Sequence, residues 1–248
     1  MDDKIVLTVA YDGTDYCGWQ VQDNGETVQA VLTRTLESLF GELTVLGASR
    51  TDAGVHALGQ RALVTLPKDI CKVPLDKLPA VVNAKLPFDV VVTDAMRVAE
   101  DFHPIFDAKR KTYTYDIHNA LYANPQTRRY TYHVRAALDV DAMSHAAACF
   151  VGTHDFEAFR AMGGTTKTSV RTMYGASVVR EGEHIRFTIT GSGFLYNMVR
   201  IMAGTLIFVG MGKLTPDKIP DVLASRNRTC AGVTAPPQGL TLVRIEYE

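Results

Sequence analysis

Residues 43–66 read LTVLGASRTDAGVHALGQRALVTL and place two apolar stretches on either side of a polar turn. The stretches 43–48 and 57–66 are typical of β-strands, so we predict a strand on each side. The turn at 49–54 and the residues just after it carry an arginine, an aspartate and a histidine on one tight loop. Spacing alone favours a structural Asx-turn, in which Asp52 accepts bonds from nearby backbone N–H groups.

The sequence on the N-terminal side and just beyond this hairpin predicts further strands and helices. Apolar residues alternate before the first glycine-bearing loop and then recur at helical spacing. Polar caps and a proline mark helix starts. The expected elements are a strand over 4–10, a helix over 27–40 capped by Thr27, a helix over 74–84 opened by Pro74, and a strand over 87–98.

A second cycle of strands and helices begins near residue 106, after a break at 102–108. A hairpin is expected around Glu181-Gly182-Glu183, where two alternating stretches flank a turn. The expected elements are strands over 110–118 and 129–135, a helix from Asp139 through Phe150, strands over 172–180 and 184–190, helices over 194–210 and 215–225, and a strand over 239–247.

Strands and helices therefore alternate twice along the chain. This order predicts an α/β (α+β) fold of two α/β halves, with mixed, largely antiparallel sheets joined around a central cleft. We expect an N-terminal domain over 1–105 that carries the Asp52 loop, and a C-terminal domain over 106–248. The functional site is expected between the halves, a common place for pockets.

The overall charge argues against a nucleic-acid partner, but its distribution does not. The 248 residues carry 26 Lys and Arg against 27 Asp and Glu, a formal net charge of -1. Residues 1–101 hold 15 acids and 9 bases, whereas residues 102–248 hold 12 acids and 17 bases. Such asymmetry between halves suggests a polyanionic partner, although uneven surface charge is also ordinary.

The remaining composition narrows the class of protein. The four cysteines form no CxxC motif, and the acidic start Met1-Asp2-Asp3-Lys4 is unlike a signal peptide. Only 12 residues separate Arg200 from Lys213 in the longest late apolar stretch, too few to span a bilayer. We therefore expect a cytoplasmic protein with reduced thiols and no membrane partner.

Motifs in order along nearly the whole chain make the sequence resemble the TruA family of tRNA pseudouridine synthases. The most specific are Arg50-Thr51-Asp52-Ala53-Gly54-Val55-His56-Ala57 and Gly193-Phe194-Leu195-Tyr196-Asn197-Met198-Val199-Arg200. The others are Gly18-Trp19-Gln20, Thr27-Val28-Gln29, Asn83-Ala84 with Leu86-Pro87, Phe102-His103, Lys111-Thr112-Tyr113-Thr114-Tyr115, Asp155-Phe156 with Phe159-Arg160, Arg171-Thr172, and Ala235-Pro236-Pro237 with Gly239-Leu240.

The resemblance implies a role for each matching position. Asp52 matches the catalytic aspartate, Tyr113 the tyrosine that stacks on the target base, and Arg200 the basic residue that pairs with the aspartate. Arg50 matches an arginine implicated in holding the flipped nucleotide. The residue types suit a base isomerisation, because a paired guanidinium keeps a carboxylate ionised and an aromatic ring holds a detached uracil.

Each of these residues also has a plainly structural interpretation. Tyr113 and Tyr115 alternate with threonines, as strand residues do. Arg200 follows an apolar helical stretch, where a cation is costly unless it is paired. His56 and His103 are interpreted as structural histidines or RNA contacts, since no third ligand at metal-binding spacing accompanies them.

Stretches without acidic residues supply further candidate RNA contacts. Residues 117–138, 158–180 and 222–245 contain arginine or lysine and no Asp or Glu. Beside an RNA-modifying site such stretches become candidate phosphate contacts, although alone each is an ordinary solvated face. The expected substrate-binding residues are Tyr113, Arg50, Gln60, His56, Lys109, Arg110, Lys111, Arg160, Lys167 and Arg171.

Three departures from the family pattern concern local RNA contacts and leave the catalytic positions intact. Ser49 stands where the family usually has glycine. Pro104-Ile105 stands where it often has Ala-Arg, and Gln60-Arg61-Ala62-Leu63 differs from its usual apolar-to-aromatic sequence.

As a whole, the resemblance implies the pseudouridine synthase fold and an isomerase that converts uridines 38, 39 and 40 of the tRNA anticodon stem-loop. It also implies a homodimer in which both subunits contact one tRNA. The reaction involves no redox change and no net water, so no cofactor and no metal are implied. The alternatives are a non-catalytic tRNA-binding module, a synthase with another RNA target, or a metal-dependent hydrolase using Asp52 and His56.

Overall fold

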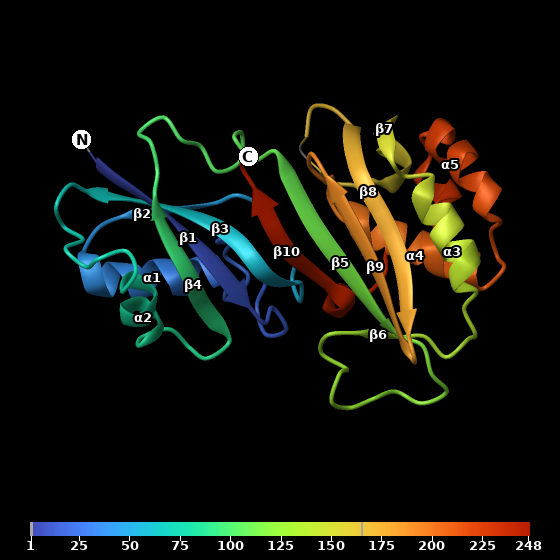
Figure 1. Ribbon diagram of the computed structural model, residues 1–248, viewed down its shortest axis with the longest axis horizontal. Coiled ribbons are helices and arrows are strands. Elements are labelled where there is room, and N and C mark those ends of the chain that lie inside the picture. The colour runs from blue at the N-terminus through green and yellow to red at the C-terminus, as the bar shows by residue number, and fades with distance from the viewer. Residues whose placement is uncertain (1, 165) are drawn as a thin grey trace. The chain divides into compact units, whose positions relative to one another are not determined.

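The structure is a computed structural model that describes residues 2–164 and 166–248, and these residues form two compact units (Figure 1). The first contains the chain up to Lys109 together with Leu242–Glu248, and the second is Arg110–Thr241. The sequence-based division into 1–105 and 106–248 leaves the final strand with the second part. The structure instead assigns most of that strand to the first unit, because it runs beside a strand of that unit.

Antiparallel strands form the first unit. Strand β1 pairs with β3 and β4, and β2 pairs with β3, all antiparallel. Ile5, Leu7 and Val9 lie on one face of β1 and are buried, and Val6 on the opposite face is buried as well. The elements are β1 (Asp2–Tyr11), α1 (Val28–Phe40), β2 (Thr44–Gly47), β3 (His56–Pro67), α2 (Leu78–Asn83) and β4 (Val90–Arg97).

Strand β10 (Leu240–Glu246) completes the sheet of the first unit from Leu242 onward, beside β3. The two backbones approach so closely at Gly59 that a Cβ there would lie 2.5 Å from the carbonyl oxygen of Val243. Only glycine fits such an approach, which fixes β10 against β3.

The second unit is a sheet in the order β5-β9-β8-β7, with β6 parallel to β5. Its other described pairs, β5/β9, β7/β8 and β8/β9, are antiparallel. The strands are β5 (Arg110–His118), β6 (Tyr132–His133), β7 (Gly152–Asp155), β8 (Val170–Glu181) and β9 (His184–Gly191). The helices are α3 (Val140–Ala148), α4 (Met198–Gly210), α5 (Ile219–Ser225) and short 3-10 turns at Glu157–Phe159, Pro216–Lys218, Arg228–Cys230 and Pro237–Gly239.

Helix α4 forms the centre of the second unit and is buried almost all round. It packs with α3 against the sheet, where Tyr115, Ile117 and Phe187 are buried (Figure 1). A Cβ at Gly204 would lie 1.9 Å from the carbonyl oxygen of Val233, so segment 231–235 lies directly on the helix backbone.

The predicted fold class is confirmed: the molecule combines helices with mixed, mostly antiparallel strands. Thr27 and Asp139 cap α1 and α3 as predicted, each side chain accepting from a backbone N–H three residues on. Among the described residues, no helix is both long and apolar enough to cross a bilayer.

Four elements differ from prediction. The expected strand 129–135 is only Tyr132–His133, because the residues before it form a hydrogen-bonded turn. Helix α2 begins at Leu78, whose amide closes a turn onto the carbonyl of Pro74 (3.0 Å). Helix α4 begins at Met198, because Asn197 is left-handed (φ 58°). Strand β7 was not predicted, since its sequence GTHD has no apolar alternation.

Candidate active site

The turn that carries Asp52 is anchored to the core of the first unit through its neighbour. Thr51 is buried, and its hydroxyl lies 2.7 Å from that of Tyr11 on β1. Its carbonyl accepts from the amide of Trp19 (3.1 Å). The amide of Val55 closes the turn onto the carbonyl of Asp52 (3.1 Å). These bonds fix the backbone of Asp52, whose side chain is half-buried.

Gly54 and Gly18 give this turn its shape. Gly54 has φ 76°, in the left-handed region that favours glycine. A Cβ at Gly18 would lie 2.5 Å from the carbonyl oxygen of Thr51, and Gly18 itself has φ 89°. The loop before α1 can therefore pass directly under the Asp52 turn only with glycine at this position.

Gln60, on β3, is fully buried, and its side-chain amide forms hydrogen bonds with the backbone at the start of the turn. Its Nε2 donates to the carbonyl of Ser49 (2.6 Å), and its Oε1 accepts from the amides of Ser49 (3.2 Å) and Arg61 (3.1 Å). One side chain thus fixes the start of the turn onto β3.

His56 holds the end of the turn. It is buried, with 3% of its surface exposed. The amide of Gly13 donates to its Nδ1 (3.1 Å), and a carboxylate oxygen of Asp12 lies 3.2 Å from the same atom. Arg50, in contrast, is exposed on the turn. Of the predicted contacts in the first unit, Arg50 and Lys109 reach solvent, while Gln60 and His56 face the interior.

Tyr113 lies on β5 in the second unit, paired with Ile189 of β9. Its ring is 5% exposed and meets Phe194 edge-on, with centroids 5.0 Å apart and an interplanar angle of 80°. Tyr115, two residues on, is buried, and its hydroxyl donates to the carbonyl of Pro236 (2.8 Å). Burial raises the pKa of Tyr115, so this hydroxyl remains protonated.

Arg200 lies on the first turn of α4 and is held in one orientation by two local acceptors. Its Nε donates to the carbonyl of Ala235 (2.8 Å), and a terminal nitrogen donates to Oδ1 of Asn197 (2.8 Å). Its positive charge opposes the pKa increase of Tyr115, so the two side chains lie within electrostatic range. The second unit therefore brings Tyr113, Phe194 and Arg200 onto neighbouring elements.

The cluster Lys109-Arg110-Lys111 has three different environments. Lys109 is exposed. Arg110 is exposed and places its guanidinium 5.1 Å from the ring centroid of Tyr174. Lys111 is half-buried, and burial together with the positive charge of Arg171 lowers its pKa to about 8.

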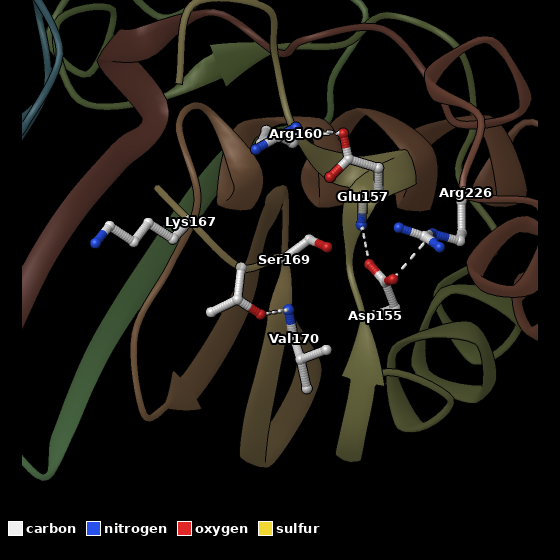
Figure 2. Close-up of a pocket in the computed structure, with 8 residues that line it drawn as sticks. Asp155, Glu157, Arg160, Lys167, Ser169, Val170 and Arg226 are labelled. Carbon is white, nitrogen blue, oxygen red and sulfur yellow. Dashed lines mark hydrogen bonds and ion pairs between the residues drawn. The ribbon is translucent and has the colours of Figure 1, made fainter. Parts of the chain in front are cut away.

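Arg160 and Lys167 line a polar pocket of about 730 Å³ in the second unit (Figure 2). Arg160 pairs with Glu157 (2.6 Å), and Arg226 pairs with Asp155 (2.9 Å). A hydrogen bond from Ser169 is the main cause that lowers the pKa of Asp155. Figure 2 shows Lys167 pointing away from both ion pairs.

Near the pocket, predicted RNA-binding cations are bonded to protein groups. Arg171 donates to the carbonyls of Thr168 (2.9 Å) and Val170 (2.6 Å), so its guanidinium braces the start of β8. The Asp155–Arg226 pair was not predicted, because 70 residues separate its members and nothing local signals it. In residues 2–164 and 166–248, no group of three or more His, Cys, Asp or Glu side chains is arranged to hold a metal ion.

Comparison with known proteins gives consistent matches. A family model described as tRNA pseudouridine synthase matches residues 7–107 and 146–248. A protein named tRNA pseudouridine synthase A from Thermoanaerobacter sp. (strain X514) is 46% identical over 245 residues, covering 98% of this chain and 99% of its own. The protein of that name from Ruminiclostridium cellulolyticum is 49% identical over 246 residues, with the same coverage. A solved archaeal box H/ACA sRNP Nop10-Cbf5 complex aligns at 13% identity with a TM-score of 0.38, covering 82% of this chain and 44% of that chain.

Proposed function

Because the chain belongs to the tRNA pseudouridine synthase family and is an isomerase, we propose that it converts uridines 38, 39 and 40 of the tRNA anticodon stem-loop, with Asp52 as catalytic nucleophile or base. The reaction breaks the bond between ribose C1′ and uracil N1 and forms one between C1′ and C5. The hydrogen on C5 is lost and N1 gains one, so no oxidant and no net water take part.

One observation carries the choice of Asp52: its turn is fixed from three directions. Thr51 bonds to Tyr11, Gln60 bonds to both backbone groups of Ser49, and His56 accepts from Gly13. A carboxylate that must act at a defined ribose and base gains from such a rigid support, because misplacement of a reacting group by about 1 Å costs roughly a hundredfold in rate.

Two roles in the second unit complete the proposal. Tyr113 provides the ring on which the detached uracil stacks, and Phe194 fixes that ring from its edge. Arg200 is given the role that the family resemblance implies, pairing with Asp52 during the reaction, since a guanidinium paired with a carboxylate opposes its protonation. Asn197 and the carbonyl of Ala235 support this role by holding the guanidinium in one orientation.

Gln60 and His56 are proposed as positioning residues. The buried amide of Gln60 bonds to the backbone of Ser49 at the start of the Asp52 loop, and the buried ring of His56, at its end, accepts from the amide of Gly13. Both residues are therefore proposed to act on RNA through that loop. The exposed cations Arg50, Lys109, Arg110 and Lys167 suit phosphate contacts. Arg160 and Arg171 already bond to protein groups, and Lys111 carries its charge only below about pH 8.

The proposal includes a homodimer in the cytoplasm, with tRNA contacted by both subunits. Analytical ultracentrifugation with and without tRNA tests this part. We expect two chains per complex, and a complex of one chain and one tRNA contradicts it.

The reaction and its targets are tested together by mapping pseudouridine in tRNA from cells that lack this protein, before and after wild-type protein is added back. We expect pseudouridine at positions 38, 39 and 40 to disappear and return. Asp52→Asn should not restore it, yet should bind tRNA with nearly unchanged affinity. Asp23→Asn, at an exposed position, is the matched control and should restore it fully. Substantial turnover by Asp52→Asn removes the catalytic assignment.

A further inference from the structure

The loop Asn119–Thr131, between β5 and β6, presents aromatic and basic side chains to solvent. Tyr122 is 78% exposed, Leu121 54% and Tyr130 48%. Arg128 is exposed as well. No aspartate or glutamate occurs anywhere between residues 117 and 138. Exposed tyrosine beside arginine, in a segment that contains no acidic residue, is a combination that binds unstacked bases and phosphates.

The base of this loop is fixed by two histidines. His118 donates through Nε2 to the carbonyl of Tyr122 (3.1 Å), and His133 donates through Nε2 to the carbonyl of Ala120 (2.8 Å). Asn119 donates to the carbonyls of Val134 (2.8 Å) and Ala136 (2.7 Å). The backbone that carries Tyr122 is thus set by strands β5 and β6.

The far side of the loop is fixed by a second group of bonds. The amide of Gln126 donates to Oδ1 of Asn124 (2.9 Å), and the amide of Tyr130 donates to the carbonyl of Thr127 (2.8 Å). The hydroxyl of Thr131 donates to that same carbonyl (3.0 Å). A loop held in this way presents its exposed ring with little ordering entropy left to lose on binding.

We infer that the loop Asn119–Thr131 is an RNA-binding surface in which Tyr122 stacks on an unpaired base of tRNA and Arg128 contacts a phosphate. This inference rests on the proposed function, because it takes tRNA as the ligand. RNA fits better than a second copy of the chain. If the loop lay on a two-fold axis it would meet its own copy, and arginines would oppose arginines with no acid in the segment to neutralise them.

The surface is assigned to binding and not to the chemical step, so its variants should change affinity and leave kcat intact. The loss of one base-stacking contact weakens binding about 5- to 150-fold. Tyr122→Ala should therefore raise Kd and KM for tRNA within that range, with kcat at saturating tRNA unchanged. Tyr122→Phe keeps the ring and should bind like the wild type.

The salt dependence of tRNA binding distinguishes the proposed role of Arg128 from that of Tyr122. The logarithm of affinity falls with the logarithm of salt concentration, by a slope of about 0.7 for each phosphate contact to single-stranded RNA. Arg128→Gln should reduce the slope by about that amount, and Tyr122→Ala should leave it unchanged. Phe88→Ala and Arg34→Gln, at exposed positions of the first unit, are matched controls and should alter neither quantity.

The measurements are tRNA Kd by filter binding at several salt concentrations, kcat and KM for pseudouridine formation, and sedimentation equilibrium of each variant. Raised Kd and KM with wild-type kcat and wild-type oligomeric state support the RNA surface. Unchanged Kd in both Tyr122→Ala and Arg128→Gln overturns it, and so does a changed oligomeric state, which assigns the loop to a protein interface. Pseudouridine formation by the wild type tests the proposed function separately.

Discussion

Around the Asp52 turn, the sequence motif predicts the position of some functional side chains, whereas the orientation of others is known only from their contacts in the structure. The sequence predicts a tight loop with Asp52, and the structure has one. Gln60 and His56 are both among the predicted substrate-binding residues, and His56 is interpreted from the sequence as a structural histidine or an RNA contact. Whether such a residue faces the ligand or the protein depends on packing from β1 and the 13–19 loop, which local sequence does not specify.

Replacing Gln60 tests its positioning role. Gln60→Leu leaves the amide and carbonyl of Ser49 without their partners, so the free energy of unfolding should fall by about 2 kcal/mol. We also expect kcat to fall while KM for tRNA stays near the wild-type value, since the loosened turn carries Asp52, the proposed catalytic carboxylate. Urea unfolding and steady-state kinetics measure both. Asn24→Leu, at an exposed position of the first unit, is the control, and equal effects in the two variants contradict the role.

Three variants of Tyr113 separate stacking from packing. Tyr113→Phe keeps the ring and its edge contact with Phe194, and should retain pseudouridine formation. Tyr113→Leu fills much of the same volume without a π face, and Tyr113→Ala leaves a cavity. Both should lose activity, about 5- to 150-fold in kcat/KM, while only Tyr113→Ala is strongly destabilised. Equal activity of the Phe and Leu variants removes the stacking role.

The lowered pKa of Lys111 leads us to expect that the free energy of unfolding rises with pH above about 8. Its pKa is about 8 in the folded chain, below the ordinary value of 10.5. Above pH 8 the unfolded chain binds the proton that the folded chain has released, so stability rises with pH in this window. The wild type should gain stability relative to Lys111→Met between pH 8 and 9.5, as measured by urea unfolding. A constant difference between the two proteins contradicts the shifted pKa.

At the scale of elements, strands and helices with a clear apolar period were predictable, and their ends were not. Strands β3 and β5 and helix α1 are nearly where their periodicity places them. The start of α4 depends on the left-handed Asn197, and the short β6 on the turn that precedes it. Such ends follow from backbone geometry and hydrogen bonds, which apolar patterns do not record.

Among the contacts between elements, we expect disruption of the one between α4 and segment 231–235 to lower the free energy of unfolding most. Gly204→Ala places a Cβ against the carbonyl of Val233, and should lower the free energy of unfolding by about 3 kcal/mol. It should also reduce kcat, because that segment provides the Ala235 carbonyl that holds Arg200. Gly175→Ala, with open space around its Cβ, is the control and should change neither. Similar urea midpoints for both variants refute the close approach.

Across the whole molecule, charge is divided between the two units. The second unit, Arg110–Thr241, holds 15 basic and 9 acidic side chains, a net charge of +6, and the rest of the chain has a net charge of -7. The sequence alone located this excess in its C-terminal part. It did not separate cations bonded to protein groups, such as Arg160 and Arg171, from exposed ones, since the Glu157 and backbone partners depend on the fold.

This distribution predicts strongly salt-dependent binding by a nearly neutral protein. Raising salt from 50 to 200 mM should weaken tRNA binding at least tenfold, because several phosphate contacts release counterions together. The value of kcat at saturating tRNA should stay constant, since the proposed action of Asp52 follows binding. Filter binding and single-turnover kinetics check the two parts, and a salt-independent Kd refutes electrostatic recognition.

Strand β10 has a consequence for how the protein is made. The first unit is assembled from two separate stretches of chain, and Leu242–Glu248 leave the ribosome after the whole of the second unit. Until then the edge of β3 at Gly59 has no strand beside it, and an unpaired edge is prone to association with other chains. The unit that begins synthesis first is therefore completed last, after the whole of the basic unit has been synthesised.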